Sequence, residues 1–153
     1  METHDVTLAR PVIGMTFDCS DPGAQATFWA RALGYIESPP PAGWATWEAF
    51  LTDHEVPEEE WNDGAGICDP ADPAITISFL KVAENKSAKN RLHLDLKVSG
   101  GRDRPAAERT QLIEAKVADL VTAGATLHER HELKGHLDHV VLLDPEGNEL
   151  CVV

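Results

Sequence analysis

Two stretches of the chain present the same order of elements, and this internal repeat constrains the fold more than any other feature. In each stretch a strand-like segment leads into a helix that ends on a glycine and then continues as strands. The junction reads Ala32-Leu33-Gly34-Tyr35 in the first stretch and Thr122-Ala123-Gly124-Ala125 in the second. Glycine favours a helix C-cap because it tolerates positive φ. We expect a single domain over residues 1–153, made of two modules at about 10–82 and 89–153.

The first module is expected to contain a strand, a helix and three further strands. Apolar and polar residues alternate over 11–19, which predicts the first strand. Ser20 or Asp21 then caps a helix whose first turn contains Pro22. We predict the remaining strands near 35–38, 44–51 and 74–82, with a polar, turn-rich insertion over 54–73.

The second module repeats this order more clearly. Leucine and valine alternate with His93, Asp95 and Lys97 over 91–98, the pattern of a half-buried strand. A helix over about 105–123 follows from an apolar stripe. The stripe consists of Ile113, Val117, Leu120 and Val121. Further strands near 125–131, 137–143 and 148–153 complete the order βαβββ, so we expect an α+β fold with two mixed sheets enclosing a cleft.

The charge balance excludes several classes of partner. Asp and Glu number 26 against 13 Lys and Arg, a net charge of -13 that disfavours nucleic acids and anionic membranes. No apolar run approaches the roughly 20 residues that span a bilayer. Residues 1–5 lack the basic start of a signal peptide. We therefore expect a cytoplasmic protein with a small-molecule ligand and no nucleic-acid or membrane partner.

Neither the cysteines nor the histidines near the C-terminus predict a metal site by their spacing. Cys19, Cys68 and Cys151 form no CxxC pair, which argues against a disulfide scaffold or a thiolate zinc site. Cys19 and Cys151 are expected as small buried hydrophobes. Four histidines lie between residues 128 and 139, and their spacing is typical of a solvated hairpin.

A turn sequence near the C-terminus places a carboxylate on the last strand. Residues 144–148 read Asp-Pro-Glu-Gly-Asn between two apolar runs, which predicts a tight turn between strands. Alternation then puts Glu149 on the face opposite Leu150 and on the same face as Cys151. This carboxylate can serve as a metal ligand, as a hydrogen-bond acceptor for a ligand, or as part of a solvated edge.

The paired layout, with Asp21-Pro22 after the first strand and the C-terminal turn sequence, resembles the glyoxalase/bleomycin-resistance/extradiol dioxygenase superfamily, also called vicinal oxygen chelate proteins. The chain is similar in particular to glyoxalase-like domains common in actinobacteria. The segments that carry the likeness are 18–22 with Phe28-Trp29 and Leu33-Gly34, then 77–79, then 89–96. The superfamily includes isomerases, dioxygenases, epimerases, thiol transferases and drug-sequestering proteins. The resemblance therefore implies the fold more narrowly than the activity.

The resemblance also implies candidate metal ligands. Metalloenzymes of the superfamily draw ligands from the first and last strands of each module, where this chain has His93 and Glu149. Imidazole and carboxylate suit a divalent metal such as Zn, Fe, Ni or Mn. In the first module Gly14 stands where the family has His or Gln, and Thr76 and Ser78 are the polar residues near the counterpart of Glu149. Three ligands are the usual minimum for catalytic zinc, so this incomplete set argues against a standard metalloenzyme. The alternative is that a neighbouring strand completes the site with His136, His139 or Glu48.

Aromatic residues are expected to line the ligand cleft beside the candidate ligands. Trp44 and Trp47 fall on opposite faces of one predicted strand, and Trp61 lies in the insertion. Asp95 shares the face of His93. Aromatic walls suit flat or cationic organic ligands. We therefore expect Trp47, Trp61 and Asp95 to contact a ligand in the cleft between the modules.

Two classes of function stay open on these residues. In the first, the chain is a lyase, isomerase or dioxygenase-type enzyme with His93 and Glu149 as catalytic residues, either as metal ligands or as an acid–base pair. In the second, it binds or sequesters a small molecule without catalysis, as a bleomycin-resistance-like protein would. Because open sheets leave edges that need covering, we expect a homodimer.

Overall fold

The computed structural model describes residues 13–153 of the chain. The first module contains β1 (Met15–Cys19), α1 (Pro22–Leu33), β2 (Ile36–Glu37), α2 (Trp47–Asp53), η1 (Glu58–Glu60), β3 (Gly64–Cys68) and β4 (Thr76–Lys81). The second contains β5 (Leu94–Leu96), α3 (Ala106–Thr122), β6 (Thr126–Leu133), β7 (His136–Leu143) and β8 (Glu149–Val152). Residues 11 and 12 of the predicted first strand, and the segment 1–5 considered as a signal peptide, lie outside the described residues.

The strands form two four-stranded mixed sheets, one in each module. Their orders are β1-β4-β3-β2 and β5-β8-β7-β6. In both sheets the first strand of the module pairs in parallel with the last, and the other neighbours are antiparallel. The predicted α+β fold with two βαβββ modules is confirmed.

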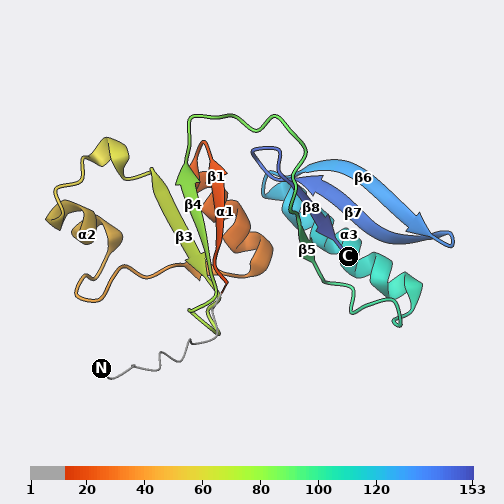
Figure 1. Cartoon of the computed structure of the whole chain (residues 1–153). Coiled ribbons are helices and arrows are strands. Elements are labelled where there is room, and N and C mark those ends of the chain that lie inside the picture. Colours follow the sequence, from red (N-terminus) through yellow and green to blue (C-terminus); the bar gives the residue numbers. More distant parts are fainter. Residues whose placement is uncertain (1–12) are drawn as a thin grey trace, which may run out of the picture.

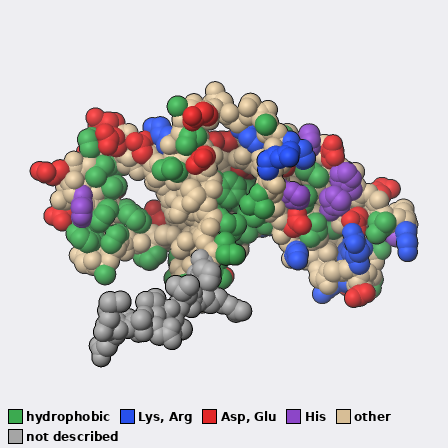
Figure 2. Space-filling view, in the orientation of Figure 1, with side chains coloured by type: hydrophobic (Ala, Val, Ile, Leu, Met, Phe, Trp, Pro, Cys, Tyr) green, Lys and Arg blue, Asp and Glu red, His purple; other side chains and the backbone are tan. Residues whose placement is uncertain are grey.

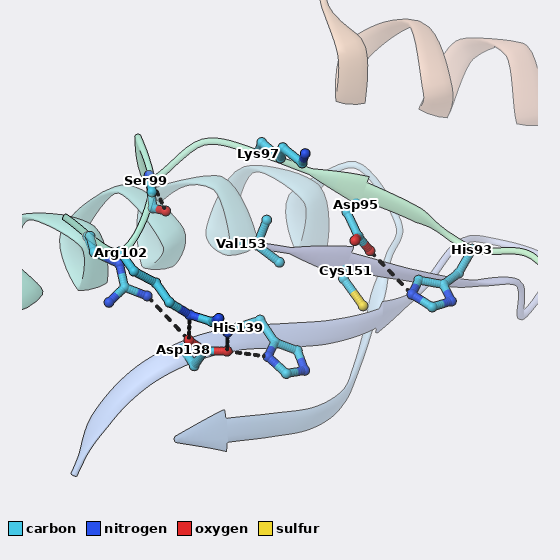
Figure 3. Close-up of a pocket in the computed structure, with 11 residues that line it drawn as sticks. His93, Asp95, Lys97, Ser99, Arg102, Asp138, His139, Cys151 and Val153 are labelled. Carbon is cyan, nitrogen blue, oxygen red and sulfur yellow. Dashed lines mark hydrogen bonds and ion pairs between the residues drawn. The ribbon is translucent and has the colours of Figure 1, made fainter. Parts of the chain in front are cut away.

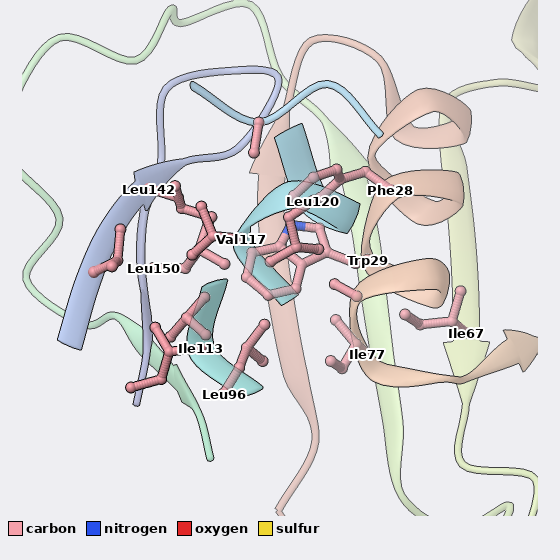
Figure 4. Close-up of a cluster of buried hydrophobic side chains, with 14 of the residues drawn as sticks. Phe28, Trp29, Ile67, Ile77, Leu96, Ile113, Val117, Leu120, Leu142 and Leu150 are labelled. Carbon is pink, nitrogen blue, oxygen red and sulfur yellow. The ribbon is translucent and has the colours of Figure 1, made fainter. Parts of the chain in front are cut away.

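Helices α1 and α3 lie between the two sheets, so the layers run sheet, helix, helix, sheet (Figure 1). Phe28 and Trp29 of α1 and Ile113, Val117 and Leu120 of α3 belong to one continuous buried cluster that both sheets complete (Figure 4). Because both helices are turned inward, each sheet keeps one face that neither helix covers. These two uncovered faces carry the polar and aromatic residues of interest.

Local signals explain where α1 begins and ends. The Asp21 side chain accepts a hydrogen bond from the backbone N–H of Ala24 at 3.2 Å, and Pro22 occupies the first turn. Gly34 ends the helix with φ +72°, in the left-handed region that glycine tolerates. Both caps were predicted from the sequence and are confirmed.

The apolar stripe of α3 packs against the second sheet as predicted, except at its last member. Ile113, Val117 and Leu120 are buried, whereas Val121 is 46% exposed in the last turn of the helix. Across from the stripe lie the inward residues of the sheet, which are Leu96, Val140, Leu142, Leu150 and Val152. No helix among the described residues combines the length and apolar character needed to cross a bilayer.

The predicted strand over 44–51 is wrong, and the third strand of the first module lies elsewhere. Residues from Trp47 onward form the helix α2, because the Thr46 hydroxyl accepts a hydrogen bond from the N–H of Ala49 at 3.1 Å and caps the first turn. The missing strand is β3, inside the stretch 54–73 that was predicted to be turn-rich throughout. The number of strands in the module was right, and the position of one was not.

Candidate functional site

Each uncovered sheet face carries its own cavity. The cavity on the second module has a volume of about 610 Å³, and that on the first has about 640 Å³. Both volumes fall in the range of small-molecule pockets. The residues expected to line one cleft are divided between these two cavities. His93 and Asp95 line the second-module cavity, and Trp47 and Trp61 line the first-module cavity.

In the second-module cavity, His93 and Asp95 lie beside Cys151 (Figure 3). Parallel pairing of β5 with β8 sets Asp95 directly opposite Cys151. His93, immediately before β5, places Nε2 at 3.3 Å from Oδ1 of Asp95. Burial, and then the negative charge of Asp95, raise the pKa of the Cys151 thiol. Cys151 is buried, as expected, but it borders a polar cavity rather than the core.

A charged network that was not predicted from the sequence forms the far wall of this cavity. Asp138 accepts two hydrogen bonds from Arg102, each at 2.9 Å, and lies 3.5 Å from Nη2 of the buried Arg109. The hydrogen bonds from Arg102 and then from His139 Nδ1, at 3.0 Å, hold the pKa of Asp138 far below its usual range. No sequence pattern indicated this charged network, because Arg102 and Asp138 are 36 residues apart in the chain.

His139 belongs to that wall, so the region of four histidines contributes more than a solvated hairpin. Its ring stacks on that of His131 from the neighbouring strand, with centroids 4.4 Å apart. His131 and His139 are opposite each other in the β6–β7 register, which explains the stacking. The hairpin itself, predicted from the spacing, is confirmed as β6 and β7.

Glu149 lies at the start of β8, but its carboxylate is engaged by the connection between the modules. It accepts a hydrogen bond from the N–H of Asn90 at 3.0 Å and lies within 4 Å of Lys86 and Lys89. Desolvation alone would raise its pKa, but the Asn90 hydrogen bond and the two lysine charges outweigh it and lower the pKa of Glu149. Glu149 therefore stays anionic and is poorly suited to act as a general base.

The first-module cavity is aromatic and is enclosed by α2 and η1. Trp47 donates its indole N–H to the carbonyl of Ser38 at 2.7 Å, and Trp61 donates to that of Val56 at 3.0 Å. With both N–H groups paired to backbone, the rings contribute apolar surface to the cavity. The sheet supplies the floor, which includes Thr16, Ser78, Phe79 and Leu80, and Glu37 and Glu60 add acidic groups.

The fold and these two cavities define the class of protein. A family model described as the glyoxalase-like domain matches residues 14–153, and the chain belongs to this family. The predicted superfamily is thereby confirmed, while the likeness to actinobacterial members stays a prediction. A search of curated proteins gives no match.

Solved structures agree on the fold. A glyoxalase/bleomycin resistance protein/dioxygenase family enzyme from Burkholderia phytofirmans PsJN is 18% identical with a TM-score of 0.57, over 91% of this chain and 94% of that one. The fosfomycin resistance protein FosX from Mesorhizobium loti is 9% identical with a TM-score of 0.56, over 95% and 92%. FosX from Listeria monocytogenes, solved with manganese(II) and a dihydroxypropylphosphonic acid, is 6% identical with a TM-score of 0.57, over 95% and 90%.

The residues present do not complete the metal site that the superfamily implies. Glu149 is held by two lysines, and it is not part of the group in which ligand atoms of His93, Asp95 and Cys151 lie within 4.8 Å of one another. On the uncovered face of the first module, Thr76 and Ser78 offer hydroxyls, which are poor ligands for zinc. No catalytic step through such a metal follows from this arrangement.

Proposed function

We propose that this glyoxalase-like protein reversibly binds a small aromatic, cationic organic molecule in the first-module cavity. The observation that carries this proposal is the pair of indoles, Trp47 and Trp61, on a cavity of about 640 Å³. Figure 2 shows hydrophobic side chains around a hollow between α2 and the rest of the first module. An aromatic wall attracts flat rings and, through the ring quadrupole, cations.

The acidic groups of the cavity favour the cationic members of that class. Glu37 and Glu60 both line it, and no Lys, Arg or His is among its lining residues. Acidic side chains also gather over α2 and η1 in the space-filling view (Figure 2). The net charge of -13 adds a long-range attraction for cations that salt weakens.

Binding without catalysis accounts for the two cavities better than the enzyme class does. A lyase, isomerase or dioxygenase-type reaction with His93 and Glu149 needs both groups at one reacting centre. Glu149 is instead neutralised by Lys86 and Lys89. Its low pKa also limits it as a base.

The test is a binding screen with tryptophan variants. A panel of aromatic amines and their neutral isosteres is titrated against the protein, with fluorescence and thermal shift as the readouts. We expect the amines to bind more tightly, and Trp61→Ala to weaken them about 10-fold or more, which corresponds to about 1.4 kcal/mol. Trp61→Phe, which keeps a ring, should recover part of the loss.

Trp44 provides the matched control. It packs against Phe50 and His54 of the same region but is not among the residues that line the cavity. Trp44→Ala should therefore leave the affinity for amines unchanged. Equal losses in Trp44→Ala and Trp61→Ala, or no preference for amines over their isosteres, would contradict the proposal.

We also propose that the protein is a homodimer in which the uncovered faces of the two modules meet between chains. Support comes from their charges: Glu37 and Glu60 line the first face without a basic residue, whereas on the second Lys97, Arg102 and Arg109 outnumber Asp95 and Asp138. Sedimentation velocity tests it. Lys97→Glu should shift the chain toward monomer, and adding Glu60→Lys should restore the dimer. A wild-type chain that stays monomeric at high concentration contradicts it.

A further inference from the structure

The register of the second sheet brings three different metal-binding side chains to one point. Asp95 lies opposite Cys151 on the paired strands β5 and β8. His93 precedes Asp95 by two residues, so strand alternation puts both on one face. One ligand atom of each of these three residues lies within 4.8 Å of the other two. In Figure 3 they gather beside the cavity, on the side away from Asp138.

We propose that His93, Asp95 and Cys151 bind a divalent transition metal, zinc or cobalt. This site uses one ligand that the superfamily pattern implies, His93, and replaces Glu149 with two residues that the pattern does not use. It lies on the second module, away from the ligand cavity that the first module of the same chain provides. Cysteine spacing does not indicate this site, because the register of β5 and β8 assembles it.

The donor atoms already stand close to the spacing that zinc requires. Zinc lies about 2.0–2.2 Å from nitrogen and oxygen and about 2.3 Å from sulfur, so tetrahedral donors are about 3.3–3.7 Å apart. His93 Nε2 and Asp95 Oδ1 are 3.3 Å apart. The remaining distances, at most 4.8 Å, need side-chain shifts of about 1 Å. The side chains of His93 and Asp95 are half-exposed, whereas Cys151 lies within β8 and is only 8% exposed.

The donor types decide which metals fit. A thiolate with imidazole favours zinc and cobalt over magnesium, calcium and manganese, which prefer oxygen donors. Three protein ligands leave a fourth tetrahedral position open, as in catalytic rather than structural zinc sites. That position adjoins a cavity of about 610 Å³, which has room for water or a small oxygen ligand. Glu149 is not needed, because Lys86 and Lys89 already balance its charge.

The experiment is titration of tag-free protein with zinc and with cobalt. We expect one metal per chain by calorimetry and a sulfur-to-cobalt charge-transfer absorption in the near ultraviolet. Cys151→Ser should abolish that absorption. Cys151→Ser and Asp95→Asn should each weaken zinc binding by more than about 100-fold, beyond the 10–100-fold that loss of an outer-shell partner costs.

Two controls separate this site from its alternatives. Glu149→Gln tests the pair that the superfamily implies, and His139→Ala tests adventitious binding by the stacked His131–His139 rings. Both should leave zinc affinity unchanged. The proposal is overturned if zinc does not bind, if the cobalt complex lacks the sulfur absorption, or if Glu149→Gln loses as much affinity as Cys151→Ser.

Folding of the variants is checked by circular dichroism. If Cys151→Ser does not fold, Asp95→Asn decides the question, because its half-exposed side chain is isosteric with the original. The outcome is also separable from that of the first-module proposal. Within one chain the two sites lie on different modules, so loss of amine binding in Trp61→Ala and loss of zinc binding in Cys151→Ser report on them separately.

Discussion

Replacing Asp144 with alanine should destabilise the protein more than any other single loss of a carboxylate, because this buried side chain ties the two modules together. Asp144 is 3% exposed and sits at the start of the turn between β7 and β8. Its Oδ2 accepts the indole N–H of Trp29 in α1 at 3.1 Å. Its carboxylate also accepts the backbone N–H groups of Glu146 and Asn148, each at 2.9 Å, and the Asn148 side-chain amide.

The magnitude follows from what each donor loses. The Trp29 indole is 1% exposed, so its N–H is left without a partner or water, at a cost of about 1–3 kcal/mol. The N–H groups of Glu146 and Asn148 are less buried and can turn to water, so each loses about 0.5–1.5 kcal/mol. We expect Asp144→Ala to lower the free energy of unfolding by about 3–5 kcal/mol, and Tm by roughly 10 °C for a chain of this size.

The assay is urea unfolding followed by circular dichroism, with two comparison variants. Asp103→Ala makes the same chemical change at an exposed position and should cost less than about 0.5 kcal/mol. Trp29→Phe removes only the N–H donor and should cost about 1–2 kcal/mol. In the double variant the losses should not add, because both remove the same hydrogen bond. Additive losses, or a cost for Asp144→Ala close to that of Asp103→Ala, would refute this account of the contact.

Three further changes test other parts of the structure. The Arg102 hydrogen bonds lower the folded-state pKa of Asp138. The resulting stabilisation is complete above the unfolded pKa near 4 and is lost as pH falls below it. Asp138→Asn should therefore flatten the decline of Tm between about pH 5 and pH 2. Gly124 has φ +115°, so Gly124→Ala should lower the free energy of unfolding by about 1–3 kcal/mol. Gly34→Asn should lower it less, because Gly34 has φ +72° and open space around it. Thermal melts compare the two variants. Burial raises the pKa of Cys19 to about 11, so iodoacetamide at pH 8 should modify Cys19 only after unfolding, as followed by mass spectrometry.

The second module was predictable because its residues follow strand and helix periods closely. The stripe through Ile113, Val117 and Leu120 had one structural solution. Alternation over 91–98 correctly placed a strand there, but β5 spans only Leu94–Leu96, and Leu92 is 72% exposed. The first module held a competing signal. Trp44–Leu51 is rich in aromatic residues, which favour strands, yet the Thr46 cap and the i, i+3 contact of Trp47 with Phe50 are those of a helix.

Strand β3 escaped prediction for a different reason. Its sequence, Gly-Ala-Gly-Ile-Cys, has little intrinsic preference for a strand, since glycine weakens strands. The sheet supplies what the sequence lacks: β3 is held between β2 and β4. A Cβ at Gly66 would stand 3.2 Å from the Ser38 hydroxyl, so the close approach of the residue that follows β2 favours glycine there. Such a contact between distant residues leaves no periodic trace in the sequence.

The residues singled out from the sequence as a site are divided in the structure, Glu149 lines neither cavity, and their functional role stays a prediction. Trp47 and Trp61 do line one cavity, and His93 and Asp95 do lie together. Their division between two cavities depends on which faces of the sheets the helices cover, and hydrophobic patterns alone do not set that. The partners of Asp138 and Glu149 likewise come from distant segments, the loop before α3 and the connection between the modules.

The inward position of α1 and α3 also decides how an inter-module cleft can arise. With both helices between the sheets, the uncovered faces of one chain do not face each other, so a second copy is needed to bring them together. If the proposed dimer forms, Lys97 of one chain approaches the acidic cavity of the other, and dissociation must change amine affinity at Trp61. Lys97→Glu should then alter the Kd for amines along with the mass of the protein. An unchanged Kd in a fully monomeric variant would place the whole binding site within the first module.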